Sequence, residues 1–414
     1  MTHCWLACRR CGREFALGPY FFGCPACVDD ATPASLEVHY DLAAAGRAFS
    51  TRHLGAERVD LMAFAPLLPF RTPERAVSLG EGATPLIRLQ RLNEAIGLPN
   101  LAVKNESQNP TWSYKDRFNA VTISIAREMG FEKIASSSTG NHGASAAAYA
   151  AAAGMRCVVL LPDETPELLQ ALIQAYGSRA IVTRWGARAP ILEALVRDHG
   201  WFPASTLAPM PVGAPFGIEG YKTIAFELIL ASRDAPLEFV FVPVGGGDGL
   251  YGLYKGWREF VAIRMAEQMP RFVACQPVGA SPVVRAVASR QDHVTPVPDA
   301  WSLATSTREE TAGDHVLTAI YESNGLAITV SEAEIREAMM LLARHGLAAE
   351  GASAVAFAGA SKAVKDRLIP DTARVAVLLT SSLIKWPRHL AELGGRAVTI
   401  SASFDELRQI TCVE

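Results

Sequence analysis

A lysine just before a predicted helix has the clearest capacity for chemistry in this sequence. Lys115 lies in the stretch TWSYKDRF, residues 111–118. The apolar residues of the following helix recur on one stripe, formed by Phe118, Val121, Ile125 and Met129. Lys115 therefore precedes a buried helix, where burying a charged amine costs folding free energy and is expected only if the amine has a function. A desolvated amine is a nucleophile that forms a Schiff base with a carbonyl compound. The alternative is an ordinary surface lysine.

A run of glycines follows an apolar stretch further along the chain. Residues 243–250 read PVGGGDGL, after the predicted strand EFVFV and before a predicted helix. Glycine lets backbone N–H groups approach an anion closely, and a helix N-terminus adds partial positive charge. The stretch is neither GxGxxG nor a P-loop, so it predicts a phosphate cradle without implying a dinucleotide. A glycine-rich turn is the alternative. Asp248 would repel a phosphate, so we expect its side chain to point away or to bind a partner.

A second loop of small polar residues also joins a predicted strand to a predicted helix. Residues 136–145 read SSSTGNHGAS. Backbone N–H groups of such a loop can hold a carboxylate, while Asn141 donates to an oxygen. Ser138 or Thr139 could instead cap the helix, and this does not exclude the other use. Together, a reactive lysine and two anion-binding loops predict a site for a phosphate-bearing aldehyde, which describes pyridoxal 5′-phosphate (PLP).

Five of the eight cysteines lie within the first 27 residues. Two C-x2-C pairs, Cys8 with Cys11 and Cys24 with Cys27, have the spacing of a structural Zn²⁺ site. Four thiolates would leave no open position for catalysis. Two disulfides are the alternative, and Cys4 is a spare or alternative ligand. The single cysteines in apolar stretches are expected to be buried fillers: Cys157, Cys275 and Cys412.

Apolar stretches alternate with helical ones from about residue 75 onward, which is typical of a parallel α/β architecture. Ser331 and Glu334 form a predicted capping box. We expect two parallel-sheet α/β lobes with a cleft at the carboxyl ends of the strands. The predicted divisions are a zinc-ribbon-like knob (1–30), a connector and start of the large lobe (31–105), a smaller lobe with the lysine (106–215), a larger lobe with the phosphate loop (216–395) and a tail (396–414).

Composition argues against several classes of partner. Of the 414 residues, 50% are hydrophobic and 20% are charged, with a formal net charge of −3. This balance does not favour nucleic acid or an anionic membrane as a partner. No uninterrupted apolar run reaches the length of a membrane span, and the N-terminus has no signal-like pattern. We therefore expect a cytoplasmic protein whose cysteine ribbon supports a neighbouring domain rather than binding nucleic acid.

The sequence around the lysine resembles a known family. Residues 106–117, ESQNPTWSYKDR, resemble the E-x-x-N-P-T-G-S-F-K-D-R segment of threonine synthases, which are fold-type II PLP enzymes. Further segments follow in the order of that family: GEGATPL (80–86), STGN (138–141), EGYKTIAFEL (219–228), the glycine loop (245–249) and LLTSSLIKWP (378–387). The resemblance covers about residues 75–390, and an N-terminal cysteine ribbon also occurs in some threonine-synthase-like proteins.

The resemblance implies roles for particular residues. Lys115 would bind the cofactor as a Schiff base and act as the base at Cα. Asn141 would contact the 3′-oxygen of PLP, and Thr380 or Ser381 would meet the pyridine nitrogen. The remaining implied positions are the phosphate site, Gly245, Gly246, Gly247 and Gly249, and the substrate carboxylate site, Ser138, Thr139, Gly140 and His142. Family habit also implies a homodimer.

Several positions depart from the family pattern. Trp112 replaces a glycine and is expected to crowd the pocket, and Tyr114 replaces a phenylalanine. GNHG resembles dehydratases more than threonine synthases, and His142 could be a proton shuttle or a loop filler. Glu350 is expected to cap a helix rather than to act as a site acid. The predicted activity is a PLP-dependent lyase or synthase acting on O-phosphohomoserine or a related phospho- or hydroxy-amino acid.

Two other functions compete with this one. A threonine or serine dehydratase-like ammonia-lyase would use the same cofactor. A catalytically altered regulatory protein of the same fold is the alternative of another class, suggested by Trp112 and Asp248.

Overall fold

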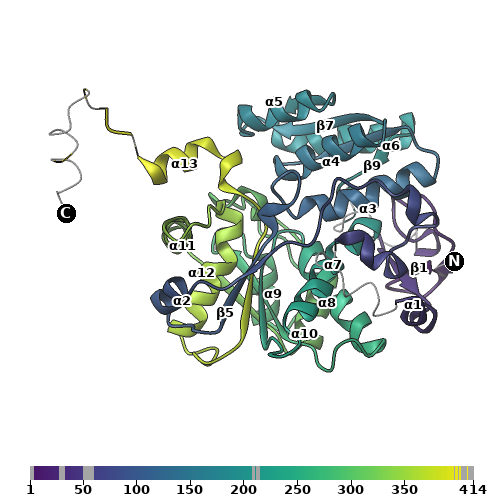
Figure 1. Cartoon of the computed structure of the whole chain (residues 1–414). Coiled ribbons are helices and arrows are strands. Elements are labelled where there is room, and N and C mark those ends of the chain that lie inside the picture. The colour runs from purple at the N-terminus through teal and green to yellow at the C-terminus, as the bar shows by residue number, and fades with distance from the viewer. Residues whose placement is uncertain are drawn as a thin grey trace.

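Alternating strands and helices build two α/β sheets, and a small antiparallel sheet stands at the N-terminal end (Figure 1). The computed structural model describes residues 4–27, 33–49, 60–207, 210, 215–395, 397–399, 401 and 408. The two α/β sheets confirm the expected fold class. Cys412 lies outside the described residues.

The larger sheet has six strands in the order β12-β11-β10-β13-β5-β4, and only β4 runs antiparallel to its neighbour. Its strands are β4 (Leu86–Ile87), β5 (Leu101–Asn105), β10 (Phe239–Pro243), β11 (Arg271–Pro277), β12 (Leu326–Val330) and β13 (Val375–Leu379). Helices pack against it: α2 (Gln90–Ile96), α7 (Pro215–Ala231), α8 (Asp248–Ala262), α9 (Pro282–Ala288), α10 (His315–Glu322), α11 (Glu332–Arg344) and α12 (Gly351–Lys365). Successive residues of β10 point to opposite faces of the sheet. Phe241 therefore packs with α12 on one face, whereas Val240 and Val242 pack with α8 and α10 on the other.

The smaller sheet has four parallel strands in the order β8-β7-β6-β9. They are β6 (Lys133–Ser137), β7 (Arg156–Pro162), β8 (Arg179–Thr183) and β9 (Phe202–Pro203), with helices α3 (Lys115–Glu128), α4 (Asn141–Ala152), α5 (Glu167–Ala175) and α6 (Arg188–His199). Strand β8 is not buried on both faces, because Ile181 and Val182 are 41% and 44% exposed. As the edge strand, β8 has a neighbour on one side only.

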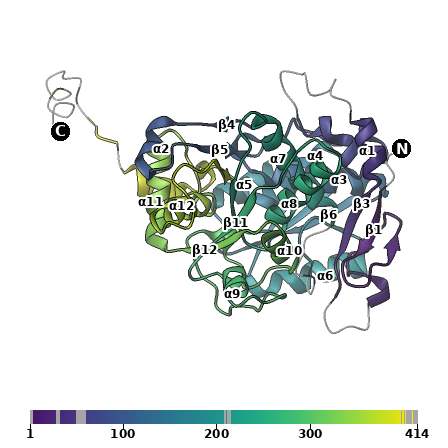
Figure 2. The same cartoon turned by 90° about the horizontal axis from the view of Figure 1, so that it is seen from below.

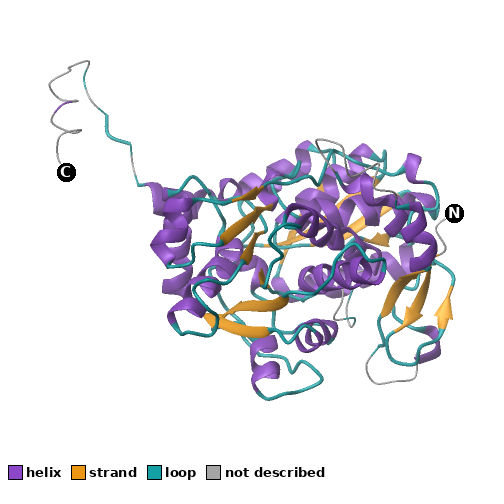
Figure 3. Ribbon diagram, turned by 60° about the horizontal axis from the view of Figure 1, so that its bottom comes forward, coloured by secondary structure: helices purple, strands orange, loops and turns teal. Residues whose placement is uncertain are grey.

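The N-terminal sheet has the order β2-β1-β3 and projects from one end of the molecule (Figures 2 and 3). Its strands are β1 (Cys4–Cys8), β2 (Glu14–Phe15) and β3 (Leu36–Tyr40), followed by α1 (Leu42–Ala48). The Tyr40 hydroxyl donates to Glu219 of α7 at 2.7 Å. The Glu219 carboxylate also pairs with Lys222 and Lys255, each at 2.6 Å. These groups are buried, so the sheet is attached to the larger lobe by a satisfied polar cluster.

The remaining elements are short. They are helix α13 (Pro387–Gly394) and 3₁₀ helices at Pro25–Cys27, Leu61–Leu67, Pro73–Arg75, Glu106–Gln108, Trp185–Ala187, Thr305–Thr307 and Leu383–Lys385. The predicted capping box at Ser331 and Glu334 is confirmed in both directions. Cys157 and Cys275 are buried, as predicted. In the described part of the chain, no helix combines the length and apolar character that crossing a membrane requires.

Candidate active site

A cavity of about 420 Å³ lies where the carboxyl ends of β6 and β10 meet. Lys115, the serine-rich loop and the glycine loop all line it. Of the sequence-predicted site residues, the cavity brings together Lys115, Ser138, Thr139, Asn141, His142, Gly245, Gly246, Gly247 and Gly249. Gly140, Thr380 and Ser381 are not among the described lining residues. This is the strand-end position at which open α/β sheets bind ligands.

Lys115 is the first residue of α3, and the segment before it is fixed by the strand end of the other lobe. Ser113 forms an antiparallel bridge with Ser381, and the Tyr114 N–H donates to the Thr380 carbonyl at 2.8 Å. The Lys115 Nζ lies 3.3 Å from the Tyr114 hydroxyl and 4.6 Å from the centre of its ring. The amine therefore stands at the junction of the two lobes, beside an aromatic wall.

Trp112 does not crowd the cavity, so that expectation is wrong. Its side chain is 41% exposed and is absent from the cavity lining. Its backbone has a φ of 58°, in the left-handed region that glycine adopts without steric cost. The glycine of the family pattern thus matches a backbone requirement of the turn before the lysine, and the indole points outward.

The helix that bears Lys115 rests on a buried ion cluster. Arg117 is fully buried and contacts Glu106 at 2.7 Å and Glu227 at 2.6 Å. Glu227 also pairs with Lys104 at 2.5 Å. Each cation has a carboxylate partner and each carboxylate has several donors, which is what burial of charge demands. Glu106 and Arg117 belong to segment 106–117, and Glu227 belongs to segment 219–228. None of the three lines the cavity, and their ion pairs hold α3 in place.

The glycine loop has the open geometry of an anion cradle. Gly247 has a φ of 101° and forms the N-cap of α8. A methyl group added at Gly246 would meet no heavy atom within 4 Å, so the loop faces open space there. The Asp248 Oδ1 lies 3.1 Å from the His315 Nε2, within ion-pair distance but without hydrogen-bond geometry. Backbone N–H groups of the loop and helix end remain the natural contacts for a phosphate.

A side chain of the serine-rich loop, that of Ser138, caps the start of helix α4. The Ser138 hydroxyl accepts hydrogen bonds from the N–H groups of Gly140 at 2.9 Å and Gly143 at 2.8 Å. The expected capping use is therefore present. The first N–H groups of α4 have no acceptor within the helix, so those of Asn141 and His142 can meet an anion from the cavity.

His142 is oriented by the protein backbone. Its Nε2 forms a hydrogen bond with the Ala204 carbonyl, which fixes the tautomer with a proton on that nitrogen. Its ring packs edge-on against Phe118 at 4.9 Å. Burial and the positive charge of Lys115 lower the pKa of His142 to about 4. These contacts favour the loop-filler reading over the proton shuttle.

Asn141 is held by Glu350, a residue that the sequence predicted to be a helix cap. Its Nδ2 donates to both carboxylate oxygens of Glu350, at 2.9 and 2.8 Å, and to the Ser381 hydroxyl at 3.2 Å. Trp386 Nε1 also donates to Glu350. Glu350 stands at the N-cap of α12 but makes no side-chain capping bond, so the capping expectation is wrong. Two buried N–H donors need an acceptor, and the carboxylate supplies it.

Thr380 and Ser381 are buried behind Asn141. The Thr380 hydroxyl lies 2.9 Å from the Ser353 hydroxyl, and the Ser381 N–H donates to the same Ser353 oxygen at 2.8 Å. Sequence reasoning did not identify Ser353. It also missed Tyr221, Arg188, Ser205 and Thr206, which line the cavity. Tyr221 lies within the recognised segment EGYKTIAFEL (219–228), which was the available signal for it. Arg188, Ser205 and Thr206 lie outside every recognised segment, so no local signal could have found them.

The residues of the cavity fit PLP. Lys115 supplies an amine for the aldehyde, and the glycine loop at the α8 N-terminus supplies a phosphate cradle. The Asn141 Oδ1 is buried without a described partner on the cavity side of the loop. Because its Nδ2 faces Glu350, this oxygen can accept a hydrogen bond from a bound group.

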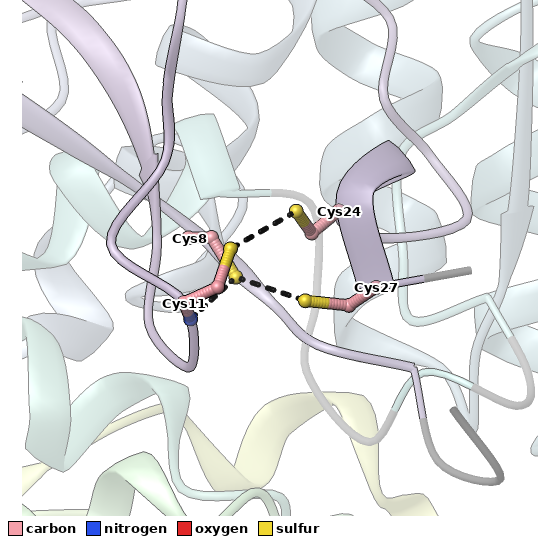
Figure 4. Close-up of side chains that lie close together, drawn as sticks. All are labelled: Cys8, Cys11, Cys24 and Cys27. Carbon is pink, nitrogen blue, oxygen red and sulfur yellow. Dashed lines mark hydrogen bonds between the residues drawn. The ribbon is translucent and has the colours of Figure 1, made fainter. Parts of the chain in front are cut away.

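The four cysteines of the two C-x2-C pairs form one cluster (Figure 4). All four Sγ atoms lie within 4.8 Å of one another, and the Cys8–Cys27 and Cys11–Cys24 Sγ separations are both 3.9 Å. A tetrahedral Zn²⁺ with Zn–S bonds of about 2.3 Å requires sulfur separations of about 3.8 Å. The donor set therefore fits zinc. Cys4 is not part of the cluster.

Comparison with known proteins agrees with this geometry. Residues 77–381 match the family described as pyridoxal-phosphate dependent enzyme. The chain is 31% identical to the threonine synthase of Methanocaldococcus jannaschii over 411 residues, covering 97% of this chain and 98% of the relative. It is also 31% identical to the threonine synthase of Methanosarcina acetivorans, covering 98% of each.

Solved structures share the fold at lower identity. An L-serine ammonia-lyase from Rhizomucor miehei superimposes with a TM-score of 0.64 at 22% identity, covering 75% of this chain and 96% of that chain. Maize serine racemase gives a TM-score of 0.63 at 18% identity, with 75% and 92% covered. The family match and the threonine synthase relatives, together with the lysine-bearing cavity, show that the chain belongs to the family of pyridoxal-phosphate-dependent enzymes.

Proposed function

We propose that this PLP-dependent lyase acts as a threonine synthase, releasing phosphate from O-phosphohomoserine and adding water to form threonine. The observation that carries this proposal is one cavity in which Lys115 stands between a phosphate cradle and a second anion-binding loop. The similarity to threonine synthases over nearly the whole chain supports it.

Bound PLP would supply an electron sink for charge that develops at the substrate Cα. In this proposal Lys115 holds the cofactor covalently and moves the proton at Cα. Its neighbour Tyr114, with a hydroxyl 3.3 Å from the amine, orients the Nζ. The cofactor phosphate would bind at Gly245, Gly246, Gly247 and Gly249.

The other proposed contacts come from both lobes. Asn141 would face the 3′-oxygen, and Thr380 or Ser381 would lie near the pyridine nitrogen. The substrate carboxylate would bind at Ser138, Thr139, Gly140 and His142. Because the Gly140 N–H is occupied by Ser138, the helix N–H groups of Asn141 and His142 would carry most of that contact.

A product assay tests the reaction. Purified protein with added PLP would receive O-phosphohomoserine, O-phosphoserine, threonine and serine separately, and phosphate, threonine, ammonia and keto acid would be measured. Threonine and phosphate from O-phosphohomoserine are expected. Lys115→Ala should lose turnover by orders of magnitude while its far-UV spectrum is unchanged, whereas the exposed Lys365→Ala should keep wild-type turnover. Normal turnover by Lys115→Ala would refute its role.

An ammonia-lyase acting on threonine or serine is the second candidate. The GNHG sequence at residues 140–143 favours it, since it resembles dehydratases. The same assay separates the two, because this candidate requires ammonia and keto acid from a hydroxy amino acid and no phosphate.

We also propose a structural Zn²⁺ at Cys8, Cys11, Cys24 and Cys27, which the tetrahedral spacing of the sulfur atoms supports. A cytoplasmic homodimer remains our expectation. Sedimentation equilibrium of the purified protein would test the dimer, and a monomer at micromolar concentration would contradict it.

A further inference from the structure

Arg188 brings a positive charge to the cavity from an element that none of the recognised motifs contains. It is the first residue of α6 and lines the cavity, partly buried. Its Nη1 donates to the Ser137 hydroxyl and its Nε to the Trp185 carbonyl, both at 3.3 Å. The guanidinium is therefore directed by two weak neutral contacts.

An aromatic ring holds this guanidinium in place. The Arg188 Cζ lies 4.4 Å from the centre of the Trp185 ring, and the Arg308 Cζ lies 4.5 Å from the same centre. The two guanidinium groups differ in whether a carboxylate balances their charge. Arg308 pairs with Glu164 at 2.8 Å, whereas no carboxylate of the described chain forms an ion pair with Arg188. Orientation without a counter-ion is the arrangement expected of a group that awaits an anionic ligand.

No carboxylate of the described residues lies within ion-pair distance of Arg188, although Glu309 acts on it electrostatically. Asp248 lines the same cavity, and its Oδ1 lies 3.1 Å from the His315 Nε2. Glu309 also lines the cavity, without an ion pair to Arg188 among the described residues. Burial lowers the pKa of Arg188 and Glu309 partly opposes this, so the guanidinium gains from a nearer anion.

The other anions of the proposed reaction already have sites. The cofactor phosphate is assigned to the glycine loop after β10, and the α-carboxylate to the loop after β6. Arg188 lies on a third element, in contact with the Ser137 hydroxyl, and Ser205 and Thr206 line the same cavity. The Ser205 oxygen accepts from the Ser137 N–H at 2.9 Å, which leaves its own proton free to donate.

We propose that Arg188 is a specificity-determining residue that binds an anionic group at the far end of the substrate side chain, namely a phosphate. This rests on the proposed function in that it assumes a small phospho-amino acid as substrate. A guanidinium matches phosphate oxygens in pairs, and the hydroxyl groups complete the contact. A hydroxy-amino acid would leave this cation without a partner, which disfavours its binding.

Binding measurements on the PLP-loaded enzyme test the proposal without turnover. 2-Amino-5-phosphonopentanoate has the chain length of O-phosphohomoserine but a methylene in place of the bridging oxygen. Norvaline is the same molecule without the phosphonate. Dissociation constants of both would be measured by isothermal titration calorimetry for wild type, Arg188→Gln and Arg184→Gln. Arg184 is exposed, four residues earlier, and does not line the cavity.

The proposal requires selective loss in one variant. Arg188→Gln should weaken phosphonate binding roughly 10- to 100-fold, the range for loss of hydrogen bonds to a charged group. Its norvaline affinity should stay within about twofold, as should both affinities of Arg184→Gln. Equal losses for the two ligands would overturn the proposal, as would a wild type that binds phosphonate no better than norvaline. Arg188-dependent phosphonate binding without any turnover of O-phosphohomoserine would support this anion site and refute the proposed function.

Discussion

A single methyl group on α7 should disturb the position of Lys115. Gly220 lies where α7 crosses α3, and a Cβ at this position would be 1.9 Å from the Arg117 carbonyl oxygen. The obstacle is backbone, with the Arg117 carbonyl carbon at 2.5 Å and the Phe118 nitrogen at 3.0 Å. No side-chain rotation can relieve this contact. In Gly220→Ala the two helices must therefore move apart.

The size of this movement follows from the contact distances. Real Cβ atoms essentially never approach a neighbour closer than 3.0 Å, so the contact must open by at least 1.1 Å from 1.9 Å. Arg117 is two residues from Lys115 on the same helix, so the amine moves with it. Misplacing a catalytic group by about 1 Å can lower turnover about 100-fold. Overpacking typically costs about 1–3 kcal/mol of stability, of which the better helix propensity of alanine returns about 1 kcal/mol.

The assay compares two glycine-to-alanine variants. Turnover with O-phosphohomoserine and the midpoint of thermal unfolding would be measured for Gly220→Ala and for Gly394→Ala. Gly394 ends α13, and a methyl group there meets no atom within 4 Å. We expect lost turnover and a lower midpoint for the first variant, with wild-type values for the second. Wild-type turnover in Gly220→Ala would refute the idea that this helix contact positions the lysine.

Three further predictions concern other parts of the molecule. In Glu350→Gln only one side-chain oxygen remains to accept from the Asn141 Nδ2 and the Trp386 Nε1. Cofactor titration of the apoenzyme should therefore show roughly 10-fold weaker PLP binding. An unchanged affinity would contradict the role of Glu350 in holding Asn141. Cys8→Ser should abolish a zinc content of about one ion per chain, measured by elemental analysis, and lower the unfolding midpoint; full zinc retention would disprove the ligand set. Because the pKa of His142 is lowered from 6.5 to about 4, the unfolded state binds more protons between these values. Wild type should therefore lose up to about 3 kcal/mol of stability as the pH falls from 6.5 to 4, relative to a His142→Asn variant. Parallel stability curves from denaturant titrations of the two proteins would argue against this.

Local sequence patterns predicted much of the site. The glycine loop, the serine-rich loop and Lys115 are each contained in fewer than a dozen consecutive residues, and each sits at a strand end or helix start. Parallel strands direct their carboxyl ends to one edge, so these loops were expected to meet. The cysteine pairs were predictable for the same reason, because C-x2-C spacing alone brings two sulfur atoms to one turn.

One wrong expectation concerns local backbone geometry, and the other concerns a contact between distant segments. Trp112 was read as a bulky neighbour of the lysine, but its backbone φ turns the side chain outward. Glu350 was read as a local cap, but its carboxylate binds Asn141, which is 209 residues away in the chain. Neither the turn geometry nor the remote partner leaves a periodic signal in the sequence.

Residue order alone predicted the alternation of strands and helices, the two candidate anion-binding loops, the paired cysteines and the lysine, because each depends on neighbours within a few residues. The packing of the chain established that Arg188 lines the cavity without an ion pair to any carboxylate of the described residues, and that Glu350 hydrogen-bonds Asn141. It also decided that α3 rests on the cluster of Arg117, Glu106 and Glu227. The physical reason is that desolvated polar groups must be satisfied by whichever partners the packed chain brings within hydrogen-bond distance.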